Sequence, residues 1–159
     1  MSLELKRVEK KVGQDTHIYR TDLVFKKNTI NILLGSTLAG KTTLMQIMAG
    51  LDKPTSGEIW FNGKNVTGQA VQKRNVSMVY QQFINYPNFT VFDNIASPLK
   101  IIGTSSEEIK KRVGDVADLL KLSGMLNKKP NELSGGQQQR TALARALIKD
   151  SGLILLDEP

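Results

Sequence analysis

The sequence predicts an α/β fold, because short apolar runs alternate along the chain with stretches of helical periodicity. Residues 30–34 form an apolar run that leads through a glycine-rich turn into a helical stretch. Two more apolar runs, at residues 76–80 and 153–156, are separated by helical segments. Loose alternation at residues 3–8 and 17–25 predicts the strands of an N-terminal antiparallel sheet. The expected architecture is therefore an α/β core with an N-terminal β subdomain.

The glycine-rich turn has the pattern Gly35-x-x-x-x-Gly40-Lys41-Thr42, which is typical of a phosphate-binding loop. Its glycines let the backbone curl, so that successive N–H groups point at one anion, and the helix that follows adds its positive dipole end. Lys41 can reach the β- and γ-phosphates, and the Thr42 hydroxyl can bind the Mg²⁺ that bridges them. An ordinary turn can match this pattern by chance. The strand before it and the helix after it favour nucleotide binding.

The composition is that of an ordinary globular chain, since 40% of the 159 residues are hydrophobic and 23% are charged. No apolar run reaches the roughly 18–20 residues that cross a bilayer, and no signal peptide is predicted. The lack of cysteine excludes disulfides and suits a cytosolic protein. A net charge of +7 fits an anionic partner. Lysines on solvated faces are the simpler interpretation, and without a basic stripe interleaved with aromatics we expect no nucleic-acid partner.

The first half of the chain has clear turn signals. Residues 13–15 are predicted to join the two N-terminal strands. The helix after the phosphate loop is expected to run from Thr43 to Ala49, because Gly50 favours a helix end. Residues 58–61 are predicted to form a strand, and Asn62-Gly63 after it is a strong hairpin signal.

Two helices are predicted in the middle of the chain. The first begins with Thr90 as its cap, and Pro98 is expected to interrupt or kink it. The second begins at Ser105 or Ser106 and is expected to end near Gly124. Its predicted apolar face comprises Ile109, Val113, Val116 and Leu120.

A third helix is predicted from Ser134 to about Lys149, because Ser134 and Gln137 fit a capping box. Ser134-Gly135-Gly136 at this helix start is also a second candidate anion site, although plain capping explains it equally well. One nucleotide does not easily need two such helix starts from the same subunit. The pattern therefore suggests two copies that face each other, each completing the other's site.

The last predicted strand, residues 153–156, ends at Asp157-Glu158. In open α/β sheets, ligands bind beyond the carboxyl ends of the strands. Asp157 is therefore predicted to bind Mg²⁺, and Glu158 to orient an attacking water or accept its proton. A solvated pair that caps the strand is the alternative, but the phosphate loop favours catalysis.

The chain resembles the ATP-binding subunit of an ATP-binding-cassette (ABC) transporter. Four motifs carry this resemblance, and they occur in the family's order. Residues 35–42 resemble the Walker A loop, and Gln81 resembles the Q-loop glutamine. Residues 133–137, Leu-Ser-Gly-Gly-Gln, match the family signature, and residues 153–159 resemble Walker B with its catalytic glutamate. Residues 80–94 are similar to importers of sugars and glycerol phosphate.

The resemblance implies a phosphate-loop NTPase core, an N-terminal antiparallel β subdomain and a helical subdomain. It also implies a head-to-tail dimer that binds ATP and Mg²⁺ between its subunits. The implied nucleotide-binding residues are Gly35, Ser36, Thr37, Leu38, Ala39, Gly40, Lys41, Thr42 and Thr43. Glu158 and Gln81 would be catalytic, while Thr42, Gln81 and Asp157 would hold Mg²⁺ and water. Ser134, Gly135, Gly136 and Gln137 would reach the nucleotide of the opposite subunit.

The implied function is ATP hydrolysis that energises solute import, of a carbohydrate or glycerol-phosphate type. The implied partners are membrane-spanning permease subunits and, indirectly, a solute-binding protein, at the cytoplasmic face of the inner membrane. A soluble cassette ATPase of DNA repair or translation is one alternative, and an inactive fragment is another. The expected division is residues 1–80 (β subdomain and Walker A core), 81–133 (Q-loop and helical subdomain) and 134–159 (signature helix and Walker B strand).

The chain departs from the family pattern in three places. Ser36 stands where proline is common, a minor change because the loop amides, not that side chain, do the binding. Val12 stands where an aromatic residue usually stacks on adenine, so that Tyr19 or His17 would have to substitute. The family continues past Walker B with a D-loop, a switch histidine and further strands. We therefore expect a fragment whose domain lacks its C-terminal part and which hydrolyses ATP poorly by itself.

Overall fold

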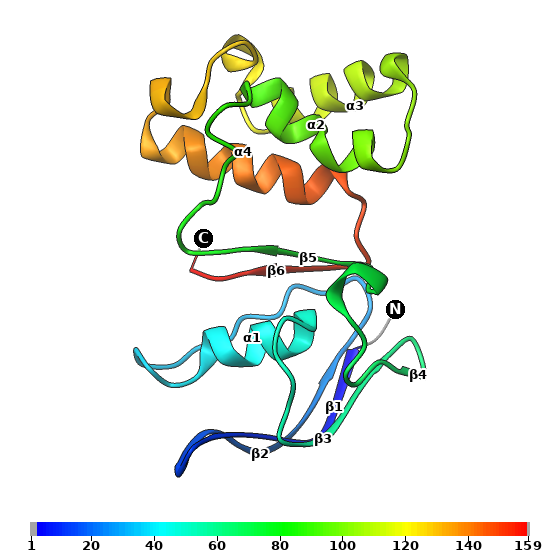
Figure 1. Ribbon diagram of the computed structural model, residues 1–159, viewed down its shortest axis with the longest axis vertical. Coiled ribbons are helices and arrows are strands. Elements are labelled where there is room, and N and C mark those ends of the chain that lie inside the picture. Colours follow the sequence, from blue (N-terminus) through cyan, green and yellow to red (C-terminus); the bar gives the residue numbers. More distant parts are fainter. Residues whose placement is uncertain (1–2, 159) are drawn as a thin grey trace. The chain divides into compact units, whose positions relative to one another are not determined.

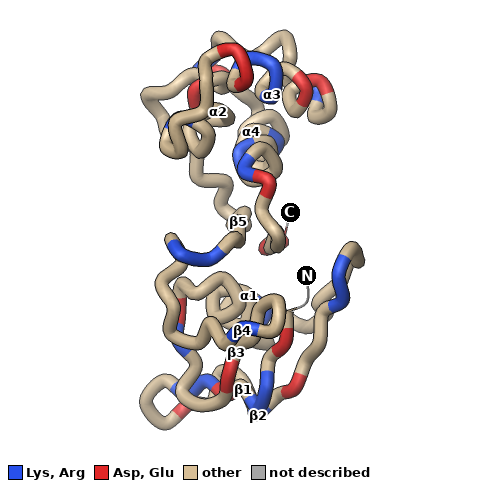
Figure 2. The backbone as a smooth tube through the Cα atoms, turned by 90° about the vertical axis from the view of Figure 1, so that its right-hand side faces the viewer, with Lys and Arg blue, Asp and Glu red and all other residues tan. Residues whose placement is uncertain are grey.

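The structure, a computed structural model, describes residues 3–158. The chain forms two compact units, Met1–Val76 and Ser77–Pro159, and each is described by itself. Lys and Arg residues are spread along both units and interspersed with Asp and Glu (Figure 2). Among the described helices, none is long and apolar enough to span a bilayer.

The N-terminal unit is built on a four-stranded antiparallel sheet with the order β2-β1-β3-β4 (Figure 1). Its strands are β1 (Leu3–Val12), β2 (Asp15–Phe25), β3 (Ser56–Phe61) and β4 (Lys64–Asn65). Inward-facing side chains such as Leu5, Val8 and Ile59 are almost fully buried. The predicted N-terminal antiparallel sheet and both of its hairpin turns are confirmed.

The predicted strand at residues 30–34 is wrong. These residues form no strand, and Ile30, Ile32 and Leu34 are 95%, 79% and 87% exposed. A buried strand needs neighbours that satisfy its backbone N–H and C=O groups. Within residues 3–158, the sheets are β2-β1-β3-β4 and β5-β6, and the 30–34 run joins neither.

Helix α1 (Lys41–Ala49) follows the glycine-rich loop and starts at Lys41 rather than at the predicted Thr43. Its end at Gly50, in the left-handed conformation, is as predicted. The buried guanidinium of Arg74 donates to the carbonyls of Ile47 and Met48 in the last turn of α1. It also donates to Val66 and Gln69, and burial lowers its pKa. Arg74 thereby holds the end of the helix that the loop begins.

The C-terminal unit contains a two-stranded sheet, β5 (Val76–Val79) and β6 (Leu153–Leu156), whose strands run in the same direction (Figure 1). The β6 strand forms where it was predicted, but its burial is lower than expected. Only Leu155 is buried, and Leu156 is 39% exposed. As in the 30–34 run, apolar composition predicted more burial than these residues have.

Three helices make the core of the C-terminal unit: α2 (Val91–Ile101), α3 (Ser106–Leu119) and α4 (Gly135–Ile148). This unit also has the 3₁₀ helices η2 (Ser123–Met125) and η3 (Pro130–Glu132), whereas η1 (Val71–Lys73) lies in the N-terminal unit. The predicted caps Thr90 and Ser134 each accept a backbone N–H at their helix starts, and so does Ser105, one of the two predicted starts of α3. The buried core includes Val91, Ile95, Leu99, Ile109, Val113, Val116, Leu122, Leu133, Ala144 and Ile148, and Leu120 packs against it.

Pro98 lies inside α2, and the predicted interruption does not occur because the helix continues to Ile101. Proline has no N–H to donate to the carbonyl of Asn94, four residues earlier. The hydroxyl of Ser97 donates to that carbonyl instead, at 2.9 Å. A neighbouring side chain thus satisfies the acceptor that Pro98 leaves open.

The second predicted helix, α3, ends at Leu119 and not near Gly124, which lies in η2. Lys121 adopts a positive φ of 56°, and the N–H of Leu122 donates to the carbonyl of Ala117 at 2.7 Å. This is a Schellman helix end built without glycine. Burial of Leu122, which is 0% exposed, favours the early turn over a longer helix.

Candidate functional site

The predicted phosphate-binding loop is curled. The N–H of Ala39 donates to the carbonyl of Ser36 at 3.2 Å, and Leu38 has a φ of 66°. The Lys41 ammonium donates to the carbonyls of Gly35 and Ser36, both at 3.0 Å. The loop therefore wraps around the Lys41 ammonium at the start of α1, where helix N–H groups and their dipole favour an anion.

Gly40, the N-cap of α1, must be glycine for two reasons, its backbone conformation and the lack of space for a side chain. Its φ of +85° is strained for any residue with a side chain. A Cβ at this position would lie 2.7 Å from the carbonyl oxygen of His17 and 2.7 Å from the Ile18 side chain. The glycine therefore lets the loop lie directly against β2.

The residues considered for stacking on adenine lie on the β1–β2 hairpin. Val12 and Tyr19 are 50% and 76% exposed, and His17 is also exposed. Of these three residues, His17 borders the loop, through its carbonyl beside Gly40. Ile18 beside it is buried and anchors the strand.

In the C-terminal unit, the predicted Q-loop and Walker B residues meet. The Gln81 amide donates to a Glu158 carboxylate oxygen at 2.9 Å. Asp157 is 4% exposed, and its N–H donates to the carbonyl of Val79 at 2.9 Å. The ends of β5 and β6 therefore bring one amide and two carboxylates together, as strands that run in the same direction would. Pro159, the last residue of the predicted Walker B motif, lies outside the described residues.

The predicted signature residues lie at the start of α4. The Gln137 N–H donates to the Ser134 hydroxyl at 3.4 Å, and the Ser134 N–H donates to the Gln137 side chain at 2.8 Å. This capping box is as predicted. Ser134, Gly135 and Gly136 are exposed, so the helix start faces solvent.

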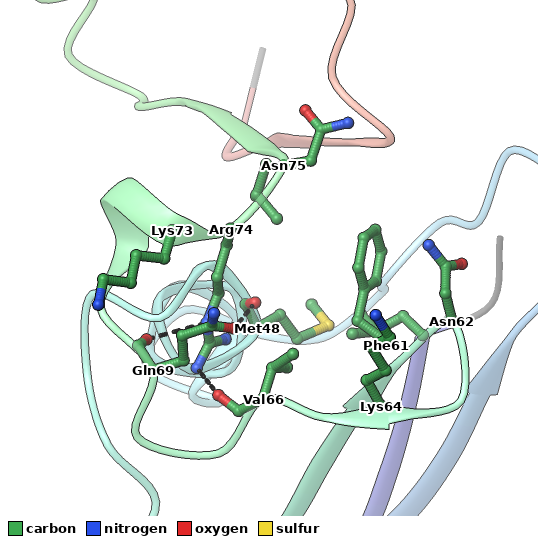
Figure 3. A pocket seen from close by; sticks show the side chains of 11 residues that line it. Met48, Phe61, Asn62, Lys64, Val66, Gln69, Lys73, Arg74 and Asn75 are labelled. Atoms are coloured by element: carbon green, nitrogen blue, oxygen red, sulfur yellow. Dashed lines mark hydrogen bonds between the residues drawn. The ribbon is translucent and has the colours of Figure 1, made fainter.

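The predicted site residues form two groups. Residues 35–43 belong to the N-terminal unit, whereas Gln81, Asp157, Glu158 and the start of α4 belong to the C-terminal unit. Within residues 3–158, no three His, Asp or Glu side chains cluster as a metal site. A hollow of about 360 Å³ in the N-terminal unit is lined by Phe61, Lys64 and Arg74 among others, and by none of the predicted site residues (Figure 3).

Sequence reasoning missed two polar residues that hold the structure together, Asn94, which is buried, and Arg145, which is half-buried. Asn94 is 0% exposed, and its side chain holds the segment that precedes α2. Arg145 lies in the last turn of α4, and burial lowers its pKa. The available signal in the sequence was a polar residue among apolar ones in a predicted helix. Asn94 lies between Val91 and Ile95, and Arg145 lies between two alanines.

Together, the curled loop, the strand-end carboxylates and the capped glycine-rich helix start define the class of protein. The model of a family described as ABC transporter matches residues 19–159. The chain therefore belongs to the ABC transporter family, and it corresponds to the family's ATP-binding domain.

Three relatives show what the chain is similar to. The Fe(3+) ions import ATP-binding protein FbpC of Photobacterium profundum is 44% identical over 98% of this chain and 44% of its own length. The glucose import ATP-binding protein GlcV of Saccharolobus solfataricus is 52% identical over 80% of this chain and 37% of its own length. The sulfate/thiosulfate import ATP-binding protein CysA of Mesostigma viride is 41% identical over 100% of this chain and 46% of its own length. The chain thus spans less than half the length of these relatives.

A solved structure confirms the fold. It is the dimeric structure of a post-hydrolysis state of the ATP-binding cassette MJ0796, bound to ADP and Pi. The TM-score is 0.86 at 32% identity, and the match covers 97% of this chain and 72% of that one. The predicted α/β fold with an N-terminal antiparallel sheet and a helical part is therefore confirmed.

Proposed function

We propose that this chain is the ATP-binding and ATP-hydrolysing part of a subunit that energises import by an ABC transporter. The observation that carries the proposal is the phosphate loop wrapped around Lys41, at 3.0 Å from two of its own carbonyls. A triphosphate bound there would replace these carbonyls as the partner of the ammonium. The relatives, all import ATP-binding proteins by name, support the transport assignment.

In this proposal, residues 35–43 hold the phosphates through loop amides and the Lys41 ammonium. Thr42, Gln81 and Asp157 hold Mg²⁺ and its water. The residues fit this ion, because Mg²⁺ in phosphate-transfer sites typically takes one or two carboxylates together with substrate phosphates and waters. Mg²⁺ would neutralise the charge that develops on the phosphates.

Glu158 is the proposed general base. Its carboxylate accepts the Gln81 amide at 2.9 Å, which fixes the direction of the group that would take the proton from water. Gln81 is then the residue that positions Glu158. Both residues follow the ends of β5 and β6. We also retain the proposed division of the chain into residues 1–80, 81–133 and 134–159.

A second copy of the subunit is the proposed partner at the nucleotide. Ser134, Gly135, Gly136 and Gln137 form an exposed helix start that would bind the γ-phosphate held by the opposite subunit. The dimeric state of the similar cassette supports this arrangement. Permease subunits would receive the resulting motion at the cytoplasmic face of the membrane, and a binding protein would deliver the solute.

For the solute, we propose a carbohydrate or glycerol-phosphate type molecule. The 52% identity to the glucose importer subunit supports it. Relatives that import iron or sulfate match nearly the whole chain. The test of the solute must therefore compare uptake of sugars, iron and sulfate.

Deleting the gene from its organism should abolish most of the uptake of one labelled sugar or of glycerol phosphate. Uptake of labelled iron(III) and sulfate should stay unchanged, because solute choice follows the partner subunits. Returning the wild-type gene should restore uptake, and returning a Glu158→Gln gene should not. If only the uptake of iron(III) or sulfate were lost, the proposed solute class would be refuted. If the uptake of every tested solute were unchanged, the import function would be refuted.

A further inference from the structure

The segment that links β5 to α2, residues 80–90, is exposed and yet firmly held. Ile84, Tyr86 and Phe89 are 60%, 47% and 45% exposed, which is unusual for apolar side chains on one short loop. The rings of Tyr86 and Phe89 contact each other, with centroids 5.3 Å apart. Since this loop begins at the Gln81 end of β5, whatever holds it also affects Gln81.

Asn94 holds the loop from the first turn of α2. Its side-chain oxygen accepts the N–H of Tyr86 at 2.8 Å. Its amide nitrogen lies 3.0–3.2 Å from the carbonyls of Tyr86, Phe89 and Thr90. Asn94 is 0% exposed, so these contacts replace water entirely and breaking them would leave buried polar groups unsatisfied.

Arg145 holds the same loop from the last turn of α4. Its guanidinium donates to the carbonyl of Ile84 and, at 3.4 Å, to the side-chain oxygen of Asn94. It also stacks over the Tyr86 ring, 4.9 Å from the centroid. A planar guanidinium is suited to this combination of hydrogen bonding and stacking, whereas an ammonium is not.

Other loop residues lie along the rest of α4. The Asn85 amide donates to the carbonyl of Gln138 at 2.9 Å. Phe83 packs against Ala142 and Ala146, and a Cβ at Gly135 would meet its ring at 3.9 Å. The loop therefore contacts α4 from its first turn to its last.

We propose that Asn94 and Arg145 are positioning residues that make α4 and the 80–90 loop move as one body. A nucleotide that engages the start of α4 would then shift the loop, and the loop would set how Gln81 meets Glu158. This inference rests on the proposed function for its link to hydrolysis. The mechanical part, that Arg145 holds the loop, stands on the contacts alone.

The test is Arg145→Lys in the protein as its gene encodes it, with Arg112→Lys as matched control. Arg112 also donates to a buried helix carbonyl, that of Ile148, but it does not touch the loop. In Arg145→Lys, amide hydrogens of residues 82–89 should exchange about tenfold faster, the effect of losing a hydrogen bond from a charged group. Exchange in α2 and α3 should stay as in the wild type, and the control should show neither change.

In the same variant, kcat for MgATP should fall about tenfold while KM stays unchanged, because the phosphate loop is intact. Asn94→Asp serves as the second variant, since it keeps the side chain's shape but loses the two N–H donors that three carbonyls surround. Unchanged loop exchange in both variants would overturn the proposal, as would a faster loop with unchanged kcat. If the wild type hydrolysed no ATP, the proposed function would fail, and hydrogen exchange alone would still decide whether Arg145 holds the loop.

Discussion

Replacing Glu158 with glutamine should lower the rate of ATP hydrolysis by about 10²–10⁴-fold while ATP binding is retained. The amide has nearly the same shape as the carboxylate, and it can still meet Gln81, whose side chain lies 2.9 Å away in the wild type. It cannot accept a proton from water. Binding should survive because the phosphate loop lies in a different part of the chain, residues 35–43.

The measurement pairs a steady-state hydrolysis assay with calorimetric titration of MgATP. Glu107→Gln is the control, because Glu107 is an exposed carboxylate in the first turn of α3. It should hydrolyse ATP at the wild-type rate. Wild-type turnover in Glu158→Gln would show that another group accepts the proton.

Replacing Lys41 with alanine should weaken ATP binding by about 100-fold or more, since two hydrogen bonds from a charged group are lost at about 1.5–3 kcal/mol each. In the structure the ammonium makes two such bonds, to the carbonyls of Gly35 and Ser36, and a bound triphosphate would take their place. The same ammonium is the proposed partner of the β- and γ-phosphates. Its loss should therefore loosen the loop and remove the main charge contact together.

Titration of the variant with MgATP measures this loss, and Lys27→Ala is the control for the change in net charge. Lys27 is exposed and lies outside the loop, so its removal should leave the affinity within about twofold. An affinity of Lys41→Ala equal to that of Lys27→Ala would contradict the proposed phosphate site.

Local signals predicted the N-terminal sheet and the helix starts well. The turns at Gly13 and Asn62-Gly63 and the caps Thr90, Ser105 and Ser134 formed where their chemistry placed them. Each of these features is decided by residues within a few positions of one another. The capping box of Ser134 and Gln137 is an example, because both partners lie in the same turn.

Features that depend on distant residues were predicted less well. The 30–34 run has the composition of a strand but no strand beside it in residues 3–158. Pro98 stays helical because Ser97 satisfies the freed carbonyl, and α3 ends early because Leu122 turns into the core. Each outcome depends on a packing or hydrogen-bond partner that periodicity does not encode.

In the candidate site, the phosphate-loop motif predicted that the backbone curls, because glycine spacing and backbone geometry are linked directly. The contacts of the Lys41 ammonium with two loop carbonyls were not predicted. The Gln81–Glu158 contact joins residues 77 positions apart and was not predicted, because the family resemblance assigned both residues to one site without a contact between them. Asn94 and Arg145 were missed, since a polar residue that holds a loop from a helix resembles a solvated one until its partners are known.

Two copies of the subunit are proposed to share each nucleotide, and a mixture of two inactive variants tests this sharing. Lys41→Ala removes the phosphate loop's ammonium, and Gly136→Asp places a negative charge at the start of α4. A Cβ at Gly136 would meet only Arg140, at an ordinary 3.7 Å, so this variant should fold.

Each variant alone should hydrolyse almost no ATP. Mixed in equal amounts, they should form head-to-tail dimers in which an intact loop from one copy faces an intact α4 start from the other. Hydrolysis should then return to about a quarter of the wild-type rate if the two sites act independently. A mixture no more active than its two components measured separately would contradict the shared site.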